Sequence, residues 1–404
     1  MSEQMQPPRP LEGVKILEMG QLLAGPFAAA MLAWFGAEVI KLEPPGEGDP
    51  LRKFRRMYKG TALWWYSLGR NKKCITLNLR DPRGQAIARQ LVARTDVLLE
   101  NFRPGTLEKW GLGYEELKRI NPRLIMSRVS GFGQTGPYAA RPGYASVAEG
   151  YGGLRYVNGF PDRPPARPNL SLGDTLAGLH AALGILLALY HRDARGTGAG
   201  QMIDVAIYEA VFNLMESAVP EYDKLGEIRE RQGARLSGIV PSNTYVTGDA
   251  RYVIIGGNGD SIFKRLMTAA GREDLAHDPR LAHNDGRVTH EALIDEALQA
   301  WTGQHTYAEI YDALERAGVP VGPIYSIADM MRDPQFEARA LFEEADLGAG
   351  DKVKLPAFIP KLSDTPGHTD WIGPALGAHN HEIYSGLLGI SDDELATLRA
   401  DGVI

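Results

Sequence analysis

The sequence predicts an α/β fold in which a large domain with a doubly wound parallel sheet is joined to a smaller α+β domain. Short β-rich runs alternate with helical patterns through the first half of the chain, which is typical of parallel sheets with helices between the strands. The runs are apolar at nearly every position, as expected for strands covered on both faces. Further along, the pattern changes to amphipathic helices around one hairpin, and 404 residues exceed one average domain.

The expected sheet strands lie in the first half of the chain. They are Val14–Met19, Ala37–Leu42, Cys74–Leu79, Val97–Glu100 and Leu124–Val129, and the segment Met202–Ala206 follows them. Helices are expected at Pro26–Trp34 and at Ile87–Ala93. The segment Asp174–His191 is apolar almost all round, which predicts a helix buried in the core. A further helix is expected from Tyr208 to about Leu225.

The smaller domain is expected after a charged connection at Glu227–Gly238. Tyr245–Gly257 is predicted to form a hairpin and strand, and amphipathic helices follow around Ile262–Ala270, Leu293–Trp301 and Tyr307–Ala317. A last helix is expected at Asp392–Ala400. The predicted division is therefore 1–227 for the N-terminal part of the large domain, 228–330 for the small domain and 331–404 for a C-terminal segment.

Composition argues against several classes of protein. Apolar residues make up 44% and charged residues 23%, which is ordinary for a globular protein, and the net charge of -6 argues against a nucleic-acid surface. The single cysteine, Cys74, excludes a disulfide framework or a cysteine-rich metal site. The N-terminus has no secretion signal, and the longest apolar stretch, Thr175–Tyr190, is shorter than the ~20 residues of a membrane span. We therefore expect a cytoplasmic protein that binds no metal, membrane or nucleic acid.

Asp174 stands in the segment Asn169-Leu-Ser-Leu-Gly-Asp-Thr, directly before the expected apolar helix. The commonest role of aspartate at such a position is an N-cap. The same carboxylate would also have the positive end of the helix dipole behind it and apolar walls around it. Such a group can attack a carbonyl carbon while water is kept out, as covalent carboxylate catalysis requires. The local sequence is compatible with both roles.

A glycine-rich loop follows the expected strand of the smaller domain, with Gly256, Gly257, Asn258 and Gly259 in succession. One interpretation is a turn into the helix that starts near Ser261. The other is a flexible flap whose backbone approaches a reacting centre closely, because glycine has no side chain to prevent it. By itself the loop does not distinguish the two.

A series of motifs runs in order along nearly the whole chain. The motifs are Leu11-Glu-Gly-Val-Lys-Ile-Leu-Glu, Leu23-Ala-Gly-Pro, Gly36-Ala-Glu-Val-Ile-Lys-Leu-Glu, Gly46-Glu-Gly-Asp, Arg70-Asn-Lys-Lys, Glu100-Asn-Phe-Arg-Pro-Gly, Gly131-Phe-Gly-Gln-Thr-Gly-Pro, Leu172-Gly-Asp, Leu387-Leu-Gly and the final Asp401-Gly-Val-Ile. Together they resemble the class III CoA-transferases, the family of formyl-CoA transferase and carnitine CoA-transferase.

The resemblance implies a large α/β domain formed by both chain ends, two subunits interlocked like links of a chain, and Asp174 as the catalytic nucleophile. It also implies coenzyme A thioesters as substrates and no tightly bound cofactor. By matching motifs, the implied CoA contacts are Leu23, Ala24, Arg80, Asn101, Phe102, Arg103, Lys109, Pro142, Gly143, Tyr144 and Ala145. Arg80 and Lys109 suit the phosphates and pantetheine arm of CoA. The amides near Gly257–Gly259 suit the stabilisation of oxyanions.

Four positions depart from known members of the superfamily. Pro44 stands where formyl-CoA transferases have an arginine for CoA, Leu23 where they have a glutamine, and Ala145 where they have a glutamate. An oxalate or formate substrate is therefore not expected. The α-methylacyl-CoA racemases have a histidine where this chain has Tyr144, which disfavours racemisation. A racemase and a non-catalytic CoA-binding protein remain the alternatives.

The substrate is indicated by the pattern Gly238-Ile-Val-Pro-Ser-Asn with Gly256-Gly-Asn-Gly-Asp-Ser-Ile-Phe. It resembles succinyl-CoA-dependent members that act on itaconate, citramalate, malate or glutarate. The second carboxylate of such an acid needs a cationic partner, and the candidates are Arg52, Arg55, Arg141 and Arg235. The resulting prediction is transfer of CoA from succinyl-CoA to a small dicarboxylate through an aspartyl-CoA thioester.

Overall fold

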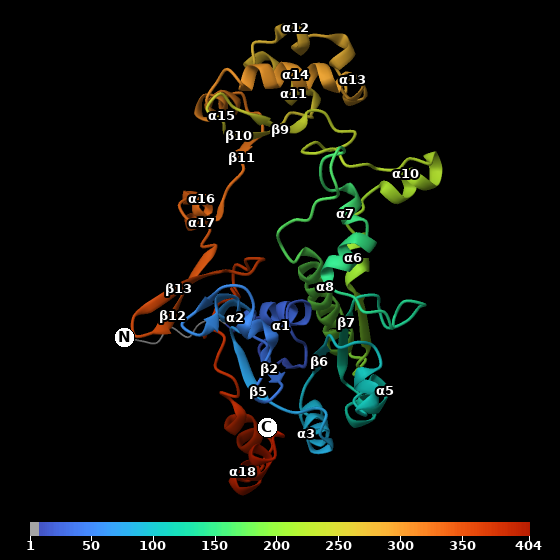
Figure 1. The fold of residues 1–404 in the computed structure, drawn as a ribbon, viewed down its shortest axis with the longest axis vertical. Coiled ribbons are helices and arrows are strands. Elements are labelled where there is room, and N and C mark those ends of the chain that lie inside the picture. Colours follow the sequence, from blue (N-terminus) through green and yellow to red (C-terminus); the bar gives the residue numbers. More distant parts are fainter. Residues whose placement is uncertain (1–7) are drawn as a thin grey trace. The chain divides into compact units, whose positions relative to one another are not determined.

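The computed structural model describes residues 8–404, which form two compact units (Figure 1). The first, here called the sheet unit, combines the residues up to Leu154 with Pro168–Glu216 and Glu337–Ile404. The second, here called the helical unit, combines Arg155–Arg167 with Ser217–Phe336. Segments from both ends of the described chain therefore belong to the sheet unit.

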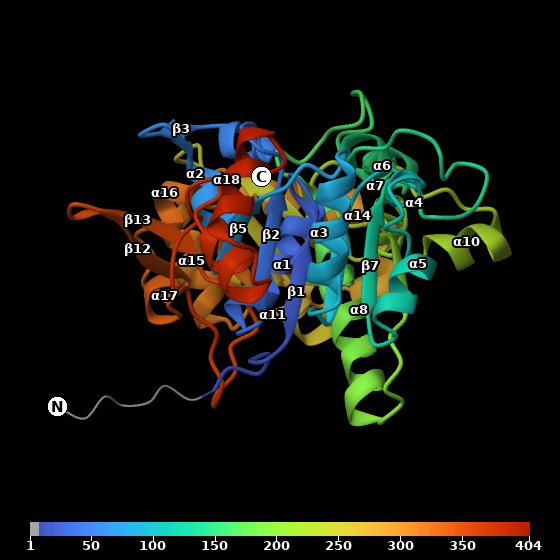
Figure 2. The ribbon, with the colours of Figure 1, turned by 90° about the horizontal axis from the view of Figure 1, so that it is seen from below.

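The sheet unit is built on six strands. They are β1 (Lys15–Glu18), β2 (Glu38–Glu43), β5 (Lys72–Thr76), β6 (Val97–Glu100), β7 (Ile125–Ser130) and β8 (Met202–Ala206). Every neighbouring pair is parallel, which confirms the predicted parallel sheet, and the order across the sheet is β5-β2-β1-β6-β7-β8 (Figure 2). The order reverses between β1 and β6. Parallel sheets bind ligands beyond the carboxyl ends of their strands at such a reversal, so the loops after β1 and β6 mark the expected site.

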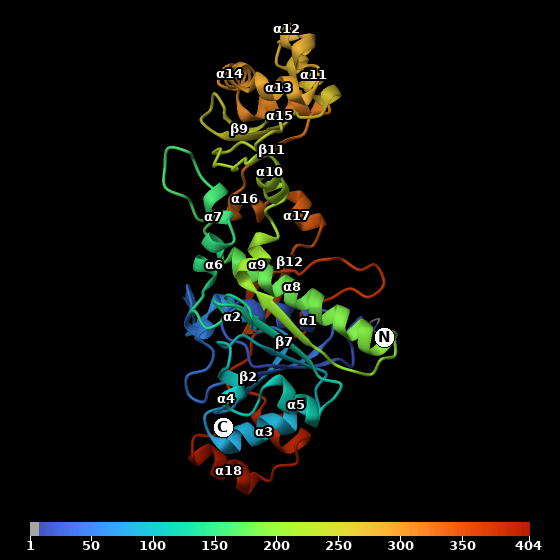
Figure 3. The same ribbon diagram turned by 90° about the vertical axis from the view of Figure 1, so that its right-hand side faces the viewer.

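Apolar side chains alternate between the two faces of the sheet, because successive residues of a strand point to opposite sides. Ile16 of β1 packs in a core with α1 (Ala24–Trp34) and α8 (Leu172–Leu189). Leu17 packs in a second core with α3 (Pro82–Val92), α5 (Tyr114–Ile120) and α18 (Asp392–Ala400). Figure 3 shows α1 and α8 on one side of β7 and α3, α5 and α18 on the other. Helices thus cover both faces, as the apolar strands predict.

The apolar helix α8 begins two residues before the expected start and continues as a π-helical turn, η2 (Tyr190–Ala194). The prediction that it is buried all round is wrong, because Leu183 is 54% exposed and Leu187 is 61% exposed. The run Leu172–Ala194 is 23 residues long, longer than expected, and by length and composition alone it is apolar enough to cross a membrane. Its buried side packs with α1, β7 and β8 in the first core, which is how the core helix of an α/β unit packs.

Two elements differ from the expected ones. The helix expected from Tyr208 to Leu225 is split into α9 (Ile207–Phe212) and α10 (Ala218–Leu225). Glu216, between them, has a φ of 46°, and such a left-handed residue cannot continue a right-handed helix. The hairpin of β12 (Phe342–Gly348) and β13 (Asp351–Pro356) was not expected, because charged residues dominate its alternation.

The boundaries between the units also differ from 1–227, 228–330 and 331–404. Residues 155–167 and 217–227 belong to the helical unit, as do residues 331–336. The first of these segments is tied to its unit by the Gly233 amide, which donates to the Gly159 carbonyl at 2.9 Å, and by Arg231, which donates to the Tyr156 carbonyl at 2.8 Å. Local composition does not indicate pairing between segments so far apart in the sequence, so it could not predict these boundaries.

The helical unit contains a three-stranded antiparallel sheet with the order β11-β10-β9. Its strands are β9 (Ser242–Val246), β10 (Tyr252–Gly256) and β11 (Val321–Pro323), and the pairing of β9 with β10 confirms the expected hairpin. Helices α11 (Asp260–Ala269), α14 (Glu291–Thr302) and α15 (Tyr307–Arg316) match the three expected helices within a few residues. Their apolar sides share one core with β9 and β10.

Candidate functional site

Asp174 is the third residue of α8 and not its N-cap. Because the helix starts at Leu172, Ser171 occupies the N-cap position, without a side-chain cap hydrogen bond. Of the two roles that the local sequence allows for Asp174, the structure therefore does not show the N-cap. Asp174 is half-buried in the first turn, where the backbone amides of a helix favour a negative charge.

Two glycines let the first turns of α8 pack closely against other helices. A Cβ at Gly178, one turn after Asp174, would lie 2.7 Å from the Ala24 carbonyl oxygen. A Cβ at Gly173 would lie 3.4 Å from the Ala145 side chain, at the start of α6 (Ala145–Tyr151). Residues four apart share one face of a helix, so Asp174 lies on the side of α8 that meets the first turn of α1. The structure thus brings together Ala24, Ala145 and Asp174.

The loop between β1 and α1 is fixed to the loop after β6. The Gln21 amide donates to Oδ1 of Asn101 at 2.8 Å, and Nδ2 of Asn101 donates back to the Gln21 carbonyl at 2.7 Å. Leu23 is the N-cap of α1 and Ala24 is its first residue, while half-buried Phe102 follows Asn101. These four predicted CoA contacts therefore stand where the strand order reverses.

Buried charged side chains anchor the loop between β1 and α1. Nζ of Lys41 lies 2.8 Å from both Oε1 of Glu18 and Oδ2 of Asp49. The same ammonium donates to the Gly20 carbonyl at 2.8 Å, and Asp49 accepts from the amide of Leu22, whose φ is 62°. Burial opposes the charge of Lys41, but Asp49 and Glu18 outweigh burial and raise the pKa of Lys41. Burial likewise opposes the charge of Asp49, but Lys41 outweighs it and lowers the pKa of Asp49.

Three predicted CoA contacts are exposed cations at the carboxyl edge of the sheet. Arg80 follows β5, whereas Arg103 and Lys109 follow β6. Among residues 8–404, no acidic side chain forms an ion pair with any of the three. The nearby Arg83, by contrast, pairs with Asp401 at 2.6 Å. Because β5 and β6 are three strand spacings apart, roughly 14 Å, the free charges suit an extended anionic ligand.

The segment Pro142–Tyr144 packs against the end of β7. A Cβ at Gly143 would lie 2.9 Å from the Cα of Gly131, so the two backbones are in direct contact. Tyr144 is the N-cap of α6 and is 71% exposed, whereas Ala145 is buried. The predicted CoA contacts therefore come from the segments that follow β1, β5, β6 and β7, all at the same edge of the sheet.

The glycine loop, Gly256–Gly259, lies in the helical unit between β10 and α11. The amides of Gly256 and Gly257 donate to the carbonyls of Pro320 and Pro241, both at 3.0 Å. The buried guanidinium of Arg287 donates to the Asn258 carbonyl at 2.7 Å. These contacts anchor the loop as a turn into α11, which is the first of the two interpretations of its sequence. Within the described chain, the amides of Asn258 and Gly259 have no protein acceptor.

The single cysteine has a structural role. Cys74 is buried in β5, and burial raises the pKa of its thiol. Its amide donates to Nδ1 of His379 at 3.0 Å. In the described part of the chain, no three His, Cys, Asp or Glu side chains are grouped so that they could hold a metal ion.

A cavity of about 380 Å³ lies in the sheet unit beside the first turns of α8. Thr175, which directly follows Asp174, and Leu179, one turn later, line it from α8. The other lining residues come from α1, from α2 (Leu63–Leu68) and its end, and from the segment after β13: Leu23, Phe27, Met31, Trp64, Ser67, Leu68, Arg70, Pro356, Ala357, Phe358 and Ile359. The volume falls within the about 300–1,000 Å³ of ordinary ligand pockets.

Two of the four arginines considered for a second carboxylate are already in ion pairs within the chain. Nε of Arg52 lies 2.7 Å from Oε2 of Glu43, and NH1 of Arg235 lies 3.1 Å from Oε2 of Glu291. Arg52 also donates to the Pro374 carbonyl at 3.0 Å. Neither guanidinium is therefore available in full to a substrate.

The other two arginines are exposed and stack on aromatic rings. The guanidinium carbon of Arg55 lies 4.5 Å from the centre of the Trp64 ring, and that of Arg141 lies 3.6 Å from the Tyr138 ring. Neither forms an ion pair with a residue in the range 8–404. Trp64 lines the cavity and Tyr138 does not, so Arg55 is the free arginine next to it.

The family model for CoA-transferase family III matches residues 11–380. The chain belongs to this family. It is 52% identical to the succinyl-CoA–D-citramalate CoA-transferase of Chloroflexus aurantiacus over the full length of both chains. It is 34% identical to the succinate–glutarate CoA-transferase of Agrobacterium fabrum, over 94% of this chain and 96% of that one. The crystal structure of a CAIB/BAIF family protein from Brucella suis superimposes with a TM-score of 0.82, at 36% identity over 94% of this chain and 99% of that chain.

The predicted family and enzyme class are therefore confirmed: the chain is a CoA-transferase of family III. The sequence missed the cavity and two residues that shape the site, Gly173 and Gly178. Both glycines stand inside an apolar helix, where glycine is otherwise unfavourable, and this was the available signal for close packing. No comparable signal marks Trp64 or Phe358, because they meet only in the folded chain.

Proposed function

We propose that this family III CoA-transferase moves coenzyme A from succinyl-CoA to a small dicarboxylic acid, with D-citramalate as the first candidate. The observation that carries the proposal is the half-buried Asp174 in the first turn of α8, next to the cavity-lining Thr175 and close to the starts of α1 and α6. The acceptor is inferred from relatives named for D-citramalate, L-malate and glutarate. Itaconate remains a further candidate of the same size.

In the first half of the proposed reaction, the Asp174 carboxylate attacks the thioester carbonyl of succinyl-CoA. The carbon–sulfur bond breaks, and a mixed anhydride and the CoA thiolate result. The thiolate then attacks the aspartyl carbonyl of the anhydride, which releases succinate and leaves an aspartyl-CoA thioester on the enzyme. Burial of Asp174 and the amides of the helix start favour this covalent route, because water is kept from the anhydride.

In the second half, the acceptor carboxylate attacks the aspartyl-CoA thioester and expels the thiolate. The thiolate then attacks the acceptor's carbonyl in the new anhydride. The acceptor leaves as its CoA ester, and the Asp174 carboxylate is regenerated. Every intermediate is an activated acyl group, and no ATP or metal is required.

CoA binding is assigned to the free cations at the carboxyl edge. We expect the Arg80→Gln and Arg103→Gln variants each to raise KM for succinyl-CoA by about tenfold, because each loses a charge-assisted hydrogen bond to CoA. The kcat of each variant should stay within about twofold of the wild-type value. Steady-state kinetics at low and high salt check this, and the difference should shrink at high salt. Arg83→Gln is the control, since Arg83 already pairs with Asp401. Equal effects of all three substitutions would contradict the assignment.

We also propose that two chains form a homodimer. Large apolar side chains are exposed along α8 and at the start of η2, namely Leu179, Leu183, Leu186, Leu187 and Tyr190. Such a patch usually marks a protein interface. Light scattering should give twice the mass of one chain, and replacing Leu183 and Leu187 together by glutamate should yield monomers. A wild-type mass equal to one chain would refute the dimer.

The function is tested by incubating the protein with succinyl-CoA and each of D-citramalate, L-malate, itaconate and glutarate, and separating the CoA esters by chromatography. A new CoA ester with at least one acid is expected, and none with oxalate or formate. CoA binding without any transfer would favour the non-catalytic alternative. Exchange of the C2 proton of a 2-methylacyl-CoA in heavy water, without transfer, would favour the racemase.

A further inference from the structure

The cavity beside the first turns of α8 contains no charged group that is free to bind a carboxylate. Its polar side chains are Ser67, Arg70 and Thr175. Oγ1 of Thr175 donates to the Ser171 carbonyl at 3.0 Å, and Oγ of Ser67 accepts from NH2 of Arg70 at 2.8 Å. The remaining lining side chains are apolar. The interior therefore suits a hydrocarbon chain.

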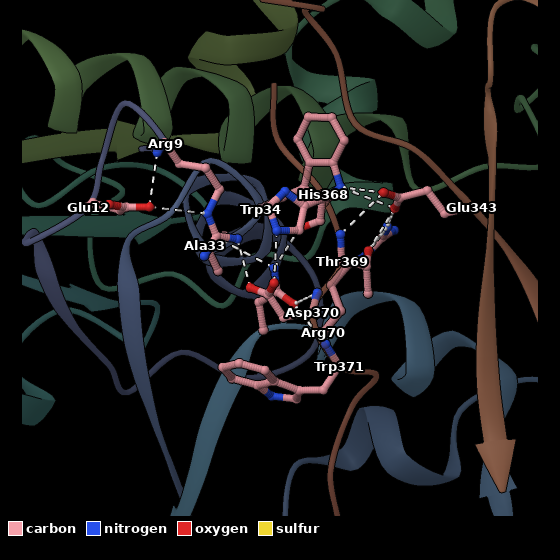
Figure 4. A network of polar contacts seen from close by, with 11 residues as sticks. Arg9, Glu12, Ala33, Trp34, Arg70, Glu343, His368, Thr369, Asp370 and Trp371 are labelled. Carbon is pink, nitrogen blue, oxygen red and sulfur yellow. Dashed lines mark hydrogen bonds and ion pairs between the residues drawn. The ribbon is translucent and has the colours of Figure 1, made fainter. Parts of the chain in front are cut away.

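Arg70 is excluded as a carboxylate partner because its five N–H groups are occupied. Nε and NH2 donate to the carbonyls of Ser67 and Pro356 and to Oγ of Ser67. NH1 donates to Oε2 of Glu343 at 3.0 Å and to Oγ1 of Thr369 at 3.3 Å. Figure 4 shows Arg70 and Thr369 directed at Glu343, which also accepts from the indole of Trp34.

A free positive charge instead lies behind one lining side chain of this cavity. The guanidinium of Arg55 stacks on the ring of Trp64, a lining residue. Its backbone has a φ of 67°, an uncommon conformation for arginine that occurs often at ligand sites. The adjacent Arg56 is also exposed, but it has no ring contact with a lining residue of the described chain.

We infer that the cavity holds the carbon chain of the acid whose carboxyl group gives up or receives CoA at Asp174, and that Arg55 binds the distal carboxylate of this acid. This inference rests on the proposed function. In it, Arg55 is the residue that favours dicarboxylic acids over acids that end in a methyl group. With the reacting carbonyl at Asp174, the methylene groups lie along Thr175 and Leu179. The distal carboxylate then reaches the cation over Trp64. An acid that ends in a methyl group leaves Arg55 without this partner.

The test compares succinyl-CoA with butanoyl-CoA, which differ only in a carboxylate or a methyl group at the distal carbon. Arg55→Gln should lower kcat/KM for succinyl-CoA by about ten- to hundredfold, since one charge-assisted contact is lost, mainly through KM. The value for butanoyl-CoA should stay within about threefold. Arg55→Lys should recover part of the loss, and Arg56→Gln is the matched control that should change neither substrate.

Three results would overturn the inference: equal losses for both thioesters, no loss for either, or the same loss in the Arg56→Gln variant. A wild type that prefers butanoyl-CoA would also overturn it, while the transferase function would stand. A wild type that transfers no CoA to any acid refutes the proposed function itself. In that event, calorimetric titration compares the binding of glutarate and of pentanoate to the wild type and to the Arg55→Gln variant. A preference for glutarate that Arg55→Gln abolishes supports the role of Arg55, and the absence of such a preference overturns it.

Discussion

Replacing Asp174 by alanine is expected to lower the turnover of CoA transfer by about 10⁴-fold or more, as loss of a covalent nucleophile does in other enzymes. The structural reason is the position of the carboxylate, half-buried in the first turn of α8 and next to the cavity-lining Thr175. Without it, the thioester has no internal acceptor, and a direct reaction between acid and thioester lacks the entropic advantage of the enzyme-bound intermediate.

The measurement is turnover with succinyl-CoA and D-citramalate, combined with mass spectrometry of the protein after treatment with succinyl-CoA and borohydride. The wild type should show a mass change confined to the peptide that contains Asp174, and the variant should show none. Asp193→Asn is the control, since Asp193 is a carboxylate just beyond the other end of α8 that pairs with Arg123 at 2.6 Å. Substantial transfer by the Asp174→Ala variant, or an adduct on another peptide, would exclude the assigned role.

Replacing Lys41 by methionine is expected to lower the free energy of unfolding by about 3–5 kcal/mol, because it leaves buried carboxylates without their partner. Asp49 would lose its ion pair and Glu18 one of its two, and the Gly20 carbonyl would lose its donor. Since Asp49 also accepts from the Leu22 amide, the loop that carries Leu23 should loosen. We therefore expect KM for acyl-CoA to rise as well.

Urea denaturation followed by tryptophan fluorescence measures this effect, since all tryptophans except Trp301 belong to the sheet unit. Lys73→Met is the matched control on the adjacent strand β5. Lys73 is partly exposed and pairs with Glu38 at 3.1 Å and with Glu382 at 2.7 Å, so its loss should cost less than about 1 kcal/mol. Similar costs for the two substitutions would mean that the buried network does not stabilise the fold more than a surface pair does.

The pH dependence of stability follows from the same pair. The pKa of Asp49 is lowered in the folded protein, so its contribution is present above the unfolded pKa of about 3.9 and is lost as the pH falls through the folded pKa. The pKa of Lys41 is raised, so its contribution is present below the unfolded pKa of about 10.4 and is lost only at higher pH. The penalty of Lys41→Met should thus be largest near neutral pH and shrink in acid.

Local sequence determined most of the sheet unit. The strands β6 and β8 and the helix α18 have the bounds that the sequence predicts, and β1, β2 and β7 differ from theirs by one residue at each end. This agreement has a simple cause: strands covered on both faces are short apolar runs, and the helices between them have a different periodicity. The ordered motifs likewise indicated the family and placed Asp174 at a helix start.

Local sequence did not determine how the surfaces of these elements are used. The sequence of an apolar helix does not indicate which of its sides other parts of the same chain will cover. In the structure, Leu183 and Leu187 of α8 are exposed. The sequence of the glycine loop does not indicate what anchors it either. The anchor is Arg287, which follows the loop by 28 residues and donates to the Asn258 carbonyl.

What the sequence by itself determined about this protein is the parallel sheet, the family and the identity of the candidate nucleophile. Only the tertiary structure decided the position of Asp174 within its helix, the cavity that joins Leu23 and Thr175 to Phe358, and the choice of Arg55 among four arginines. The physical reason is that strands and helices are encoded by periodicities within a few residues, whereas a cavity and a free charge depend on which distant segments pack together and which ion pairs they form.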